Sequence, residues 1–265
     1  MYSSYQLALK YLSYYFTAAN GSGHGTHSPF VFAFIKNVLI DRKEYPEYRL
    51  VENLRKELRL DERELDVLDL GAGSAHTKTS KRKISDIVRN AAKPAKFAQL
   101  LFRLAKYYKP ANILELGTSL GISTAYLALA NPATSVTSIE GSPAVSREAE
   151  KNVTKLSLEN VAIKTGPFDE ILPLVLPVLS GPLLVFIDGN HSRRPTLNYF
   201  HTLLPTLEEG SILIFDDIHW SEEMEEAWDE IRQHSDVMLT IDLFFIGIVF
   251  FRKEFKIRQH FTIRF

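Results

Sequence analysis

The chain of 265 residues contains no cysteine. This excludes disulfides, cysteine-based zinc sites, iron–sulfur clusters and a cysteine nucleophile. The sequence also lacks an excess of either charge, because 31 Lys and Arg are matched by 32 Asp and Glu, for a net charge of −1. A near-neutral chain lacks the broad positive field that attracts nucleic acid, so a nucleic-acid partner would depend on a local basic patch.

Long hydrophobic runs are absent as well. The strongly apolar, uncharged segment of residues 171–187 has 17 residues and is broken by three prolines and a glycine. It is too short and too interrupted to cross a bilayer. The first residues are rich in tyrosine where a signal peptide would have an aliphatic core. Together with an ordinary composition of 45% apolar and 24% charged residues, this predicts a globular, cytoplasmic protein without a membrane segment.

Residues 1–93 show no regular alternation of strands and helices. Their first 35 residues hold nine aromatic residues and no acid. A helical stripe is formed by four large apolar residues, Tyr5, Leu9, Leu12 and Phe16. Such an apolar helix is expected to be buried or to lie in an interface, for instance in a homodimer. Further helices are predicted over residues 30–40, where Ser28 and Pro29 form the start, and over 46–59. We expect a mainly helical N-terminal extension.

From residue 94 onward the pattern becomes a regular alternation. Strands are predicted over residues 113–116, 136–140, 161–165, 183–188 and 211–216, with a final pair within 237–251. Helices between the first five strands imply right-handed crossovers and parallel pairing. The last two strands have no room for a helix between them, so one must run antiparallel. Residues 94–265 are therefore predicted to form an α/β domain with a doubly wound, seven-stranded, mostly parallel sheet, whose ligands bind at the strands' carboxyl ends.

Two glutamates mark the ends of the first two strands of this domain. Glu115 stands just before a turn from Gly117 to Gly121, and the turn has only these two glycines and is not a G-x-G-x-x-G motif. A negative charge there opposes a phosphate and suits a cationic ligand. Glu140 ends the next strand, where an acid accepts the hydroxyls of a ribose. A ribose combined with a cation indicates S-adenosylmethionine (SAM). The alternative is a plain tight turn with Glu140 in solvent.

Three carboxylates follow the fourth and fifth strands, those of Asp188, Asp216 and Asp217. Because neighbouring parallel strands end side by side, we expect these groups to converge. Three oxygen donors suit Mg²⁺ or another divalent cation, which would lower the pKa of a bound hydroxyl. The alternative is that Asp188 recognises the cofactor's amino group, while the other two cap the next helix without a metal.

Two histidines border the same strand ends. His191 lies three residues after Asp188, and His219 lies two residues after Asp217. Imidazole is a good base near neutral pH, so both are candidates to take a proton from an acceptor hydroxyl, with His191 favoured. The alternative is that they are surface or packing residues.

These segments, read in order, resemble a known family. The stretches ILELGTSLGISTAYLALA, VTSIEGSP, LLVFIDGNH and GSILIFDDIHW are similar to the motifs of class I SAM-dependent methyltransferases. Within this family they are most similar to O-methyltransferases of the catechol type and to related sugar O-methyltransferases. The resemblance covers about residues 96–251, and the N-terminal part is similar to bacterial methyltransferase-like proteins. It implies a Rossmann-like fold, SAM as cofactor and a small hydroxylated acceptor.

The resemblance also implies roles for individual residues. Contacts to the cofactor would come from Glu115, Gly117, Thr118, Ser119, Gly121, Glu140, Gly141, Gly166, Phe168, Asp169 and Asp188. Phe168 would pack on the adenine, and Asp169 would accept from its amino group. In the catechol-type family the metal is held by two Asp and one Asn, and here Asp217 takes the third position. A basic lysine stands in that family where this chain has His191.

A second glycine-rich segment, residues 68–74, imitates a methyltransferase motif. The basic stretch 75–83 that follows it does not read as a helix that packs on a sheet, so we do not assign it to the cofactor. It is either a cover over the acceptor site, in which His24, His27 and the basic residues 78–83 meet an anionic substrate, or a solvated loop.

Three other functions stay open. A nicotinamide-dependent oxidoreductase would use a similar sheet, but the missing G-x-G-x-x-G weighs against it. A nucleic-acid methyltransferase has the basic residues 78–96 in its favour, yet Asp188-Gly-Asn-His differs from the N-P-P-[YF] of amino-group methylators. A non-enzymatic nucleoside-binding or interaction protein would use the aromatic N-terminus as its interface.

Overall fold

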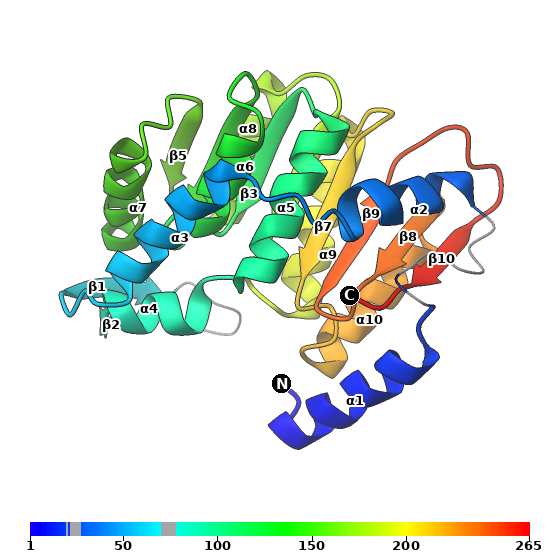
Figure 1. The fold of residues 1–265 in the computed structure, drawn as a ribbon, viewed down its shortest axis with the longest axis horizontal. Coiled ribbons are helices and arrows are strands. Elements are labelled where there is room, and N and C mark those ends of the chain that lie inside the picture. Colours follow the sequence, from blue (N-terminus) through cyan, green and yellow to red (C-terminus); the bar gives the residue numbers. More distant parts are fainter. Residues whose placement is uncertain (20, 22–27, 70–77) are drawn as a thin grey trace. The chain divides into compact units, whose positions relative to one another are not determined.

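The computed structural model describes residues 1–19, 21, 28–69 and 78–265 (Figure 1). The expectations for His24, His27 and residues 70–77 lie outside this part of the chain. Contacts divide the chain into two compact units, one of residues 1–41 with 181–265 and one of residues 42–180. This division does not coincide with the predicted boundary at residue 93, since the first 41 residues pack with the C-terminal third of the chain.

The unit of residues 42–180 is built on three parallel strands, β3 (Asn112–Leu116), β4 (Ser135–Glu140) and β5 (Val161–Thr165), in that order. Its helices are α3 (Pro46–Leu58), α4 (Ile84–Ala91), α5 (Ala95–Tyr108), α6 (Ile122–Ala130), α7 (Pro143–Lys155) and α8 (Phe168–Val175), followed by a 3₁₀ turn, η2 (Leu176–Val178). Ile113, Leu114 and Leu116 of β3 are fully buried. The predicted alternation of strand and helix is confirmed here.

A hairpin of β1 (Glu64–Asp69) and β2 (Lys78–Lys83) belongs to the same unit. Its antiparallel register sets Glu64 opposite Lys83 and Asp66 opposite Lys81. Opposite charges facing one another across a hairpin favour this register, and Lys83 Nζ donates to Glu62 at 2.7 Å, so a base of this stretch pairs with an acid of its own chain. The backbone N–H of Leu68 donates to the hydroxyl of Ser142 at 3.0 Å, which ties the hairpin to the start of α7.

The described residues of the unit 1–41 and 181–265 contain five strands: β6 (Leu183–Ile187), β7 (Ile212–Asp216), β8 (Leu239–Asp242), β9 (Ile246–Phe250) and β10 (Gln259–Thr262). Their order is β10-β8-β9-β7-β6, and β9 runs antiparallel to both of its neighbours, as predicted. The mostly parallel sheet of the described residues thus has eight strands rather than seven. The additional strand β10 has no apolar run, so its sequence does not reveal it.

The helices of this unit are α1 (Ser4–Thr17), α2 (Pro29–Phe34), a π-helical turn η1 (Ile35–Leu39), α9 (Arg193–Leu203), a 3₁₀ turn η3 (Leu204–Thr206) and α10 (Glu222–Gln233). The predicted start of α2 is confirmed, because the Ser28 hydroxyl accepts from the backbone N–H of Val31 and Pro29 is the first helical residue. Within the described residues, no helix has both the length and the apolar character that crossing a membrane requires.

Candidate functional site

The glycine turn after β3 brings β3 and β4 together at their carboxyl ends. Gly117, Ser119 and Gly121 have φ angles of 107°, 49° and 81°, in the left-handed region that glycine adopts most readily. The backbone N–H groups of Gly117 and Thr118 both donate to the carbonyl of Ile139 in β4, at 3.0 and 3.2 Å. The turn therefore fixes the first strand end against the second.

Glu115 lies inside the protein beneath this turn. The side chain is fully buried, and its Oε2 atom accepts from the hydroxyls of Thr124 and Ser138 at 2.5 and 2.6 Å. Its other oxygen, Oε1, is buried without a hydrogen-bond partner among the described residues. Burial raises the pKa of Glu115 to about 7, although hydroxyl donors act in the opposite direction. A proton therefore resides on this carboxyl for part of the time at neutral pH.

Glu140, at the end of β4, is held by backbone amides. Its Oε2 accepts from the N–H of Ser119 at 2.8 Å, and its Oε1 accepts from the N–H of Ser142 at 2.9 Å. Burial raises its pKa, and the backbone N–H groups oppose that shift. Each carboxylate oxygen has a second lone pair, so the group is positioned by the backbone while it retains capacity for two further donors.

The remaining predicted cofactor residues differ in their surroundings. The hydroxyl of Thr118 is buried and lies 2.5 Å from that of Ser138, so it faces the interior. Gly166, with a φ of 150°, donates its N–H to the carbonyl of Glu140 at 2.9 Å, which adds the end of β5 to this edge. Gly141 and Phe168 are half-buried and Asp169 is exposed.

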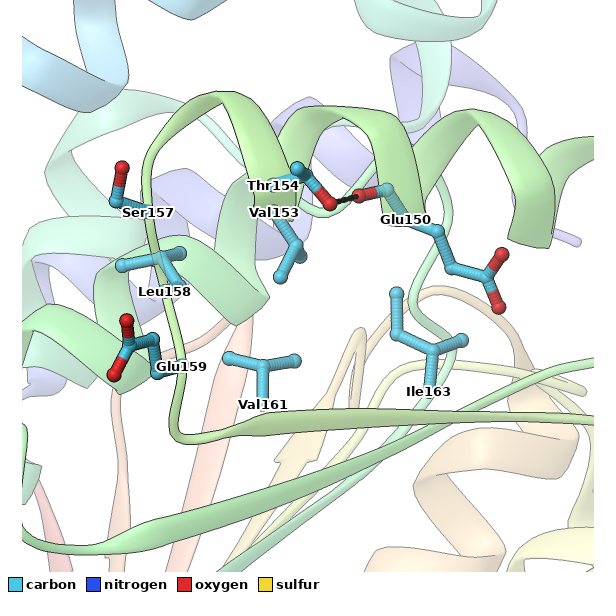
Figure 2. Close-up of a pocket in the computed structure, with 8 residues that line it drawn as sticks. All are labelled: Glu150, Val153, Thr154, Ser157, Leu158, Glu159, Val161 and Ile163. Carbon is cyan, nitrogen blue, oxygen red and sulfur yellow. Dashed lines mark hydrogen bonds between the residues drawn. The ribbon is translucent and has the colours of Figure 1, made fainter.

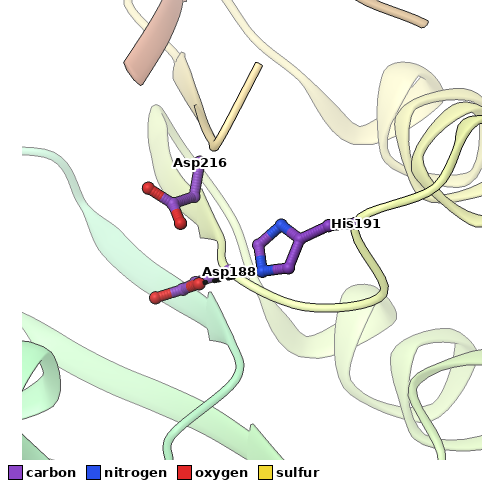
Figure 3. Close-up of side chains that lie close together, drawn as sticks. All are labelled: Asp188, His191 and Asp216. Carbon is purple, nitrogen blue, oxygen red and sulfur yellow. Dashed lines mark ion pairs between the residues drawn. The ribbon is translucent and has the colours of Figure 1, made fainter. Parts of the chain in front are cut away.

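Asp188, His191 and Asp216 form a cluster in the other unit (Figure 3). Asp216 is the last residue of β7 and is buried, whereas Asp188 and His191 follow β6 and are half-buried. One ligand atom from each lies within 4.8 Å of the others, and Nε2 of His191 is 3.5 Å from Oδ1 of Asp188. The predicted convergence of Asp188 and Asp216 is present.

Asp217 is not part of that cluster. Its backbone adopts a left-handed φ of 53°, and its N–H donates to the carbonyl of Phe245 at 2.6 Å. The cluster therefore joins an imidazole to two carboxylates, where the sequence indicated three carboxylates.

His219 has quite different neighbours. Its Nδ1 lies 2.8 Å from a carboxylate oxygen of Glu225, and its Nε2 lies 2.8 Å from one of Asp242. The ring stacks on Phe244 with 5.1 Å between centroids. Burial lowers the pKa of His219, but the two carboxylates outweigh it and raise the pKa above its usual value. Because both nitrogens are engaged, this ring is poorly suited to take a proton from a substrate.

A surface hollow lies between the C-terminal half of α7 and strand β5 (Figure 2). It is lined by Glu150, Val153, Thr154, Ser157, Leu158, Glu159, Val161 and Ile163. Its β5 residues belong to the beginning and middle of that strand, whereas Glu140 and Gly166 mark the carboxyl ends. The hollow is therefore separate from the strand-end residues described above.

The region that contains these strand ends is similar to known proteins. Residues 114–218 match the family model of a methyltransferase domain. This part of the chain resembles a methyltransferase domain. The matched region begins in β3 and extends through β7, so it contains Glu115, Glu140 and the whole cluster of Asp188, His191 and Asp216. The expected Rossmann-like methyltransferase fold is confirmed.

A curated relative is similar in sequence over part of this domain. The catechol O-methyltransferase of Niastella koreensis is 34% identical over 126 residues, which cover 46% of this chain and 55% of the relative. This chain therefore spans about half the length of that relative.

Solved structures show the same fold at low identity. The O-methyltransferase TomG of Streptomyces achromogenes, in complex with SAM, matches with a TM-score of 0.56 and 18% identity over 84% of this chain and 95% of its own. The O-methyltransferase of Bacillus cereus, in complex with SAH, matches with a TM-score of 0.53 and 19% identity over 83% and 97%.

Proposed function

We propose that this protein is a SAM-dependent O-methyltransferase that acts on a small hydroxylated molecule. The observation that carries the proposal is Glu140, a carboxylate held by two backbone amides at the end of β4. It lies within the matched methyltransferase domain, and the relatives with the same fold are described as O-methyltransferases, some in complex with SAM or SAH.

The residues of the unit 42–180 fit such a cofactor. Glu140 retains one acceptor position on each oxygen, which suits the two hydroxyls of a ribose. Glu115 adds a buried oxygen without a partner among the described residues, and a positively charged ligand above the glycine turn would favour the ionised form of this carboxyl. Phe168 and Asp169 open α8 and would contact the adenine. SAM, when bound, supplies a methyl group made electrophilic by its sulfonium.

The cluster of Asp188, His191 and Asp216 would activate the acceptor hydroxyl. An aliphatic hydroxyl is a poor nucleophile, and a neutral imidazole within hydrogen-bond reach can take its proton. In this arrangement His191 is the base, and Asp188 orients the ring. The same three donors also fit one divalent cation, for which two carboxylates and an imidazole suit Mn²⁺ or Zn²⁺ better than an all-oxygen set would. In that case His191 is a ligand and not the base.

Calorimetric titration with SAM tests the cofactor assignment. We expect wild-type protein to bind SAM and the Glu140→Ala variant to bind it more than tenfold less tightly, because a charge-assisted contact to two hydroxyls is lost. Glu159→Ala, which removes a carboxylate from the surface hollow, is the matched control and should bind normally. Stabilisation by NAD(P) with no response to SAM would instead support an oxidoreductase.

Thermal unfolding with added Mg²⁺, Mn²⁺ or Zn²⁺ tests the metal. If the cluster holds an ion, we expect a stabilising shift in wild type that Asp216→Asn abolishes, together with loss of methyl transfer after chelation. Transfer that persists after thorough chelation, with no shift from any of the three ions, assigns the activation to His191 alone.

A further inference from the structure

Helix α1 packs on its own chain through one apolar face. Tyr14 and Ala18 are buried in a cluster with Phe244, and Leu7 and Tyr11 pack against it. The ring of Tyr11 meets that of Phe244 edge-on at 5.1 Å. Leu7, Tyr11 and Tyr14 of α1 and the C-cap residue Ala18 are spaced by four, three and four positions, so they form one continuous face. We call Leu7, Tyr11, Tyr14 and Ala18 the inner seam.

A second apolar face lies on the other side of the same helix. It consists of Tyr5, Leu9, Leu12 and Phe16, which we call the outer seam, and its side chains are 73%, 49%, 51% and 79% exposed. Each member stands two positions before a member of the inner seam, which turns it by about 200° around the helix axis. The outer seam therefore points away from the residues that bury the inner one. A surface helix would normally carry polar residues there.

The helix is held in place firmly enough to present this face. The hydroxyl of Tyr2 donates to Glu225 at 2.7 Å, Lys10 Nζ lies 2.9 Å from the same carboxylate, and the hydroxyl of Tyr14 donates to the carbonyl of Ile263. Ser3 and Gln6 form a capping box at its start. A preorganised face loses little conformational freedom when it binds a partner.

The outer seam reads the same in both directions: aromatic, leucine, leucine, aromatic. In an antiparallel pair with its two-fold axis between Lys10 and Tyr11, Tyr5 faces the partner's Phe16. In the same pair, Leu9 faces the partner's Leu12. A two-fold interface requires such self-complementarity, because each contact must occur twice. The spacing of four, three and four is also that of a coiled-coil seam.

The charge of α1 fits a second copy of this chain better than other partners. The helix has no acid and a single base, Lys10, which is paired with Glu225. Two copies would therefore meet without repulsion, and no patch of charge calls for an oppositely charged protein. A helix that lies on an anionic membrane surface carries several Lys or Arg on its polar face, and α1 does not.

We propose that the outer seam pairs with the outer seam of a second copy, antiparallel and about a two-fold axis, to form a homodimer. Sedimentation velocity over a range of protein concentrations measures it. Leu9→Glu and Leu12→Glu should each weaken the dimer by more than about tenfold, since they place a charge in a desolvated centre. Both residues are half exposed in the single chain, so the variants should fold. Leu60→Glu is the matched control at a residue that is 81% exposed outside α1, and it should dimerise normally.

Cysteine cross-linking tests the antiparallel geometry, and the absence of native cysteine removes any background. An equal mixture of Tyr5→Cys and Phe16→Cys proteins should form the mixed disulfide under mild oxidation. Either protein alone should not, because positions eleven residues apart on antiparallel helices are separated by about 16 Å.

Three outcomes overturn the proposal. One is a wild-type protein that stays monomeric at all concentrations tested. Another is cross-linking of each cysteine variant with itself, which indicates a parallel pair. The third is a monomer whose outer seam instead binds phosphatidylcholine–phosphatidylserine vesicles in flotation, with binding lost in Leu9→Glu.

Discussion

The segments that follow β6 and β7 have the same spacing, an aspartate and then a histidine three positions later, yet they place their histidines in opposite settings. His191 approaches Asp188 at 3.5 Å, too far for a strong hydrogen bond, and its side chain is 30% exposed. His219 is held between Glu225 and Asp242 at 2.8 Å on each side. One histidine is available to a ligand, and the other ties α10 to β8.

The neighbours of each ring, rather than the local spacing, explain this difference. Asp242 reaches His219 from β8, 23 residues further along the chain, and Glu225 reaches it from α10. The same contrast separates the two glutamates of the other unit. Glu115 is enclosed by hydroxyls beneath the glycine turn, whereas Glu140 is held by backbone amides at the strand end. Glu115 therefore lies inside the fold, whereas Glu140 lies at the strand end with acceptor capacity on both oxygens, which suits it to a ligand.

The largest effect expected from this contrast is at His191. His191→Gln keeps size and polarity but cannot act as a base at neutral pH, so kcat for methyl transfer should fall by about 10²–10⁴-fold. The affinity for SAM and the free energy of unfolding should stay close to wild type, because the ring has weak contacts in the fold. Steady-state kinetics and calorimetry measure both. If the variant keeps its kcat, His191 is not the base, and the proposed functional difference between His191 and His219 is wrong.

Much of this arrangement was predictable from sequence, and the exceptions have physical reasons. The strands, the antiparallel β9 and the convergence of Asp188 with Asp216 follow from apolar runs and the rule that parallel strands end together. The burial of Glu115 also had a signal, since it lies within the apolar strand Asn112–Leu116. Strand β10 had none, because Gln259–Thr262 contains a single apolar residue and no apolar alternation.

Two features could not be predicted either: Asp217 lies outside the cluster, and both ring nitrogens of His219 bond to carboxylates. Both depend on contacts between residues that are distant in sequence. The N–H of Asp217 donates to the carbonyl of Phe245, and His219 bonds to Asp242 of β8. The outer seam of α1 was visible as a stripe, but only the structure shows that the other stripe is the buried one.

The second prediction concerns the enclosed carboxyl of Glu115. Its pKa is raised from 4.5 to about 7, so the folded state binds its proton more tightly than the unfolded state does. The resulting stability is fully present below pH 4.5 and is lost as the pH rises through about 7. Between pH 5 and 8 the free energy of unfolding of wild type should therefore fall, relative to Glu115→Gln, by up to roughly 3 kcal/mol.

Urea unfolding at the two pH values measures this difference. Glu159→Gln, at an exposed position, is the control and should follow wild type at both. If Glu115→Gln shows the same pH dependence as wild type, the carboxyl is ionised throughout and the enclosed setting does not control it.

His219→Gln should show the reverse of the result at His191. The substitution removes two hydrogen bonds to charged groups, and a single such bond contributes about 1.5–3 kcal/mol, so the free energy of unfolding should fall by about 2 kcal/mol after the glutamine restores part of the contact. The kcat should remain within about threefold of wild type. A large loss of kcat at unchanged stability would return His219 to the catalytic role that its position in the sequence indicated.

The smallest expected effect is at Ser142. Its hydroxyl bonds within the fold, whereas its backbone N–H bonds to Glu140, the proposed ligand-binding residue. Its buried hydroxyl would normally cap α7, but it accepts from Leu68 of the hairpin instead, while its backbone N–H donates to Glu140. Ser142→Ala leaves the N–H of Leu68 without that acceptor and should cost about 1 kcal/mol of stability. The amide to Glu140 is retained, so SAM affinity should change less than about threefold, with the exposed Ser135→Ala as control. A tenfold loss of SAM affinity without a loss of stability would mean that the hairpin helps to position Glu140. The Ser142 hydroxyl, although bonded within the chain, would then also contribute to ligand binding.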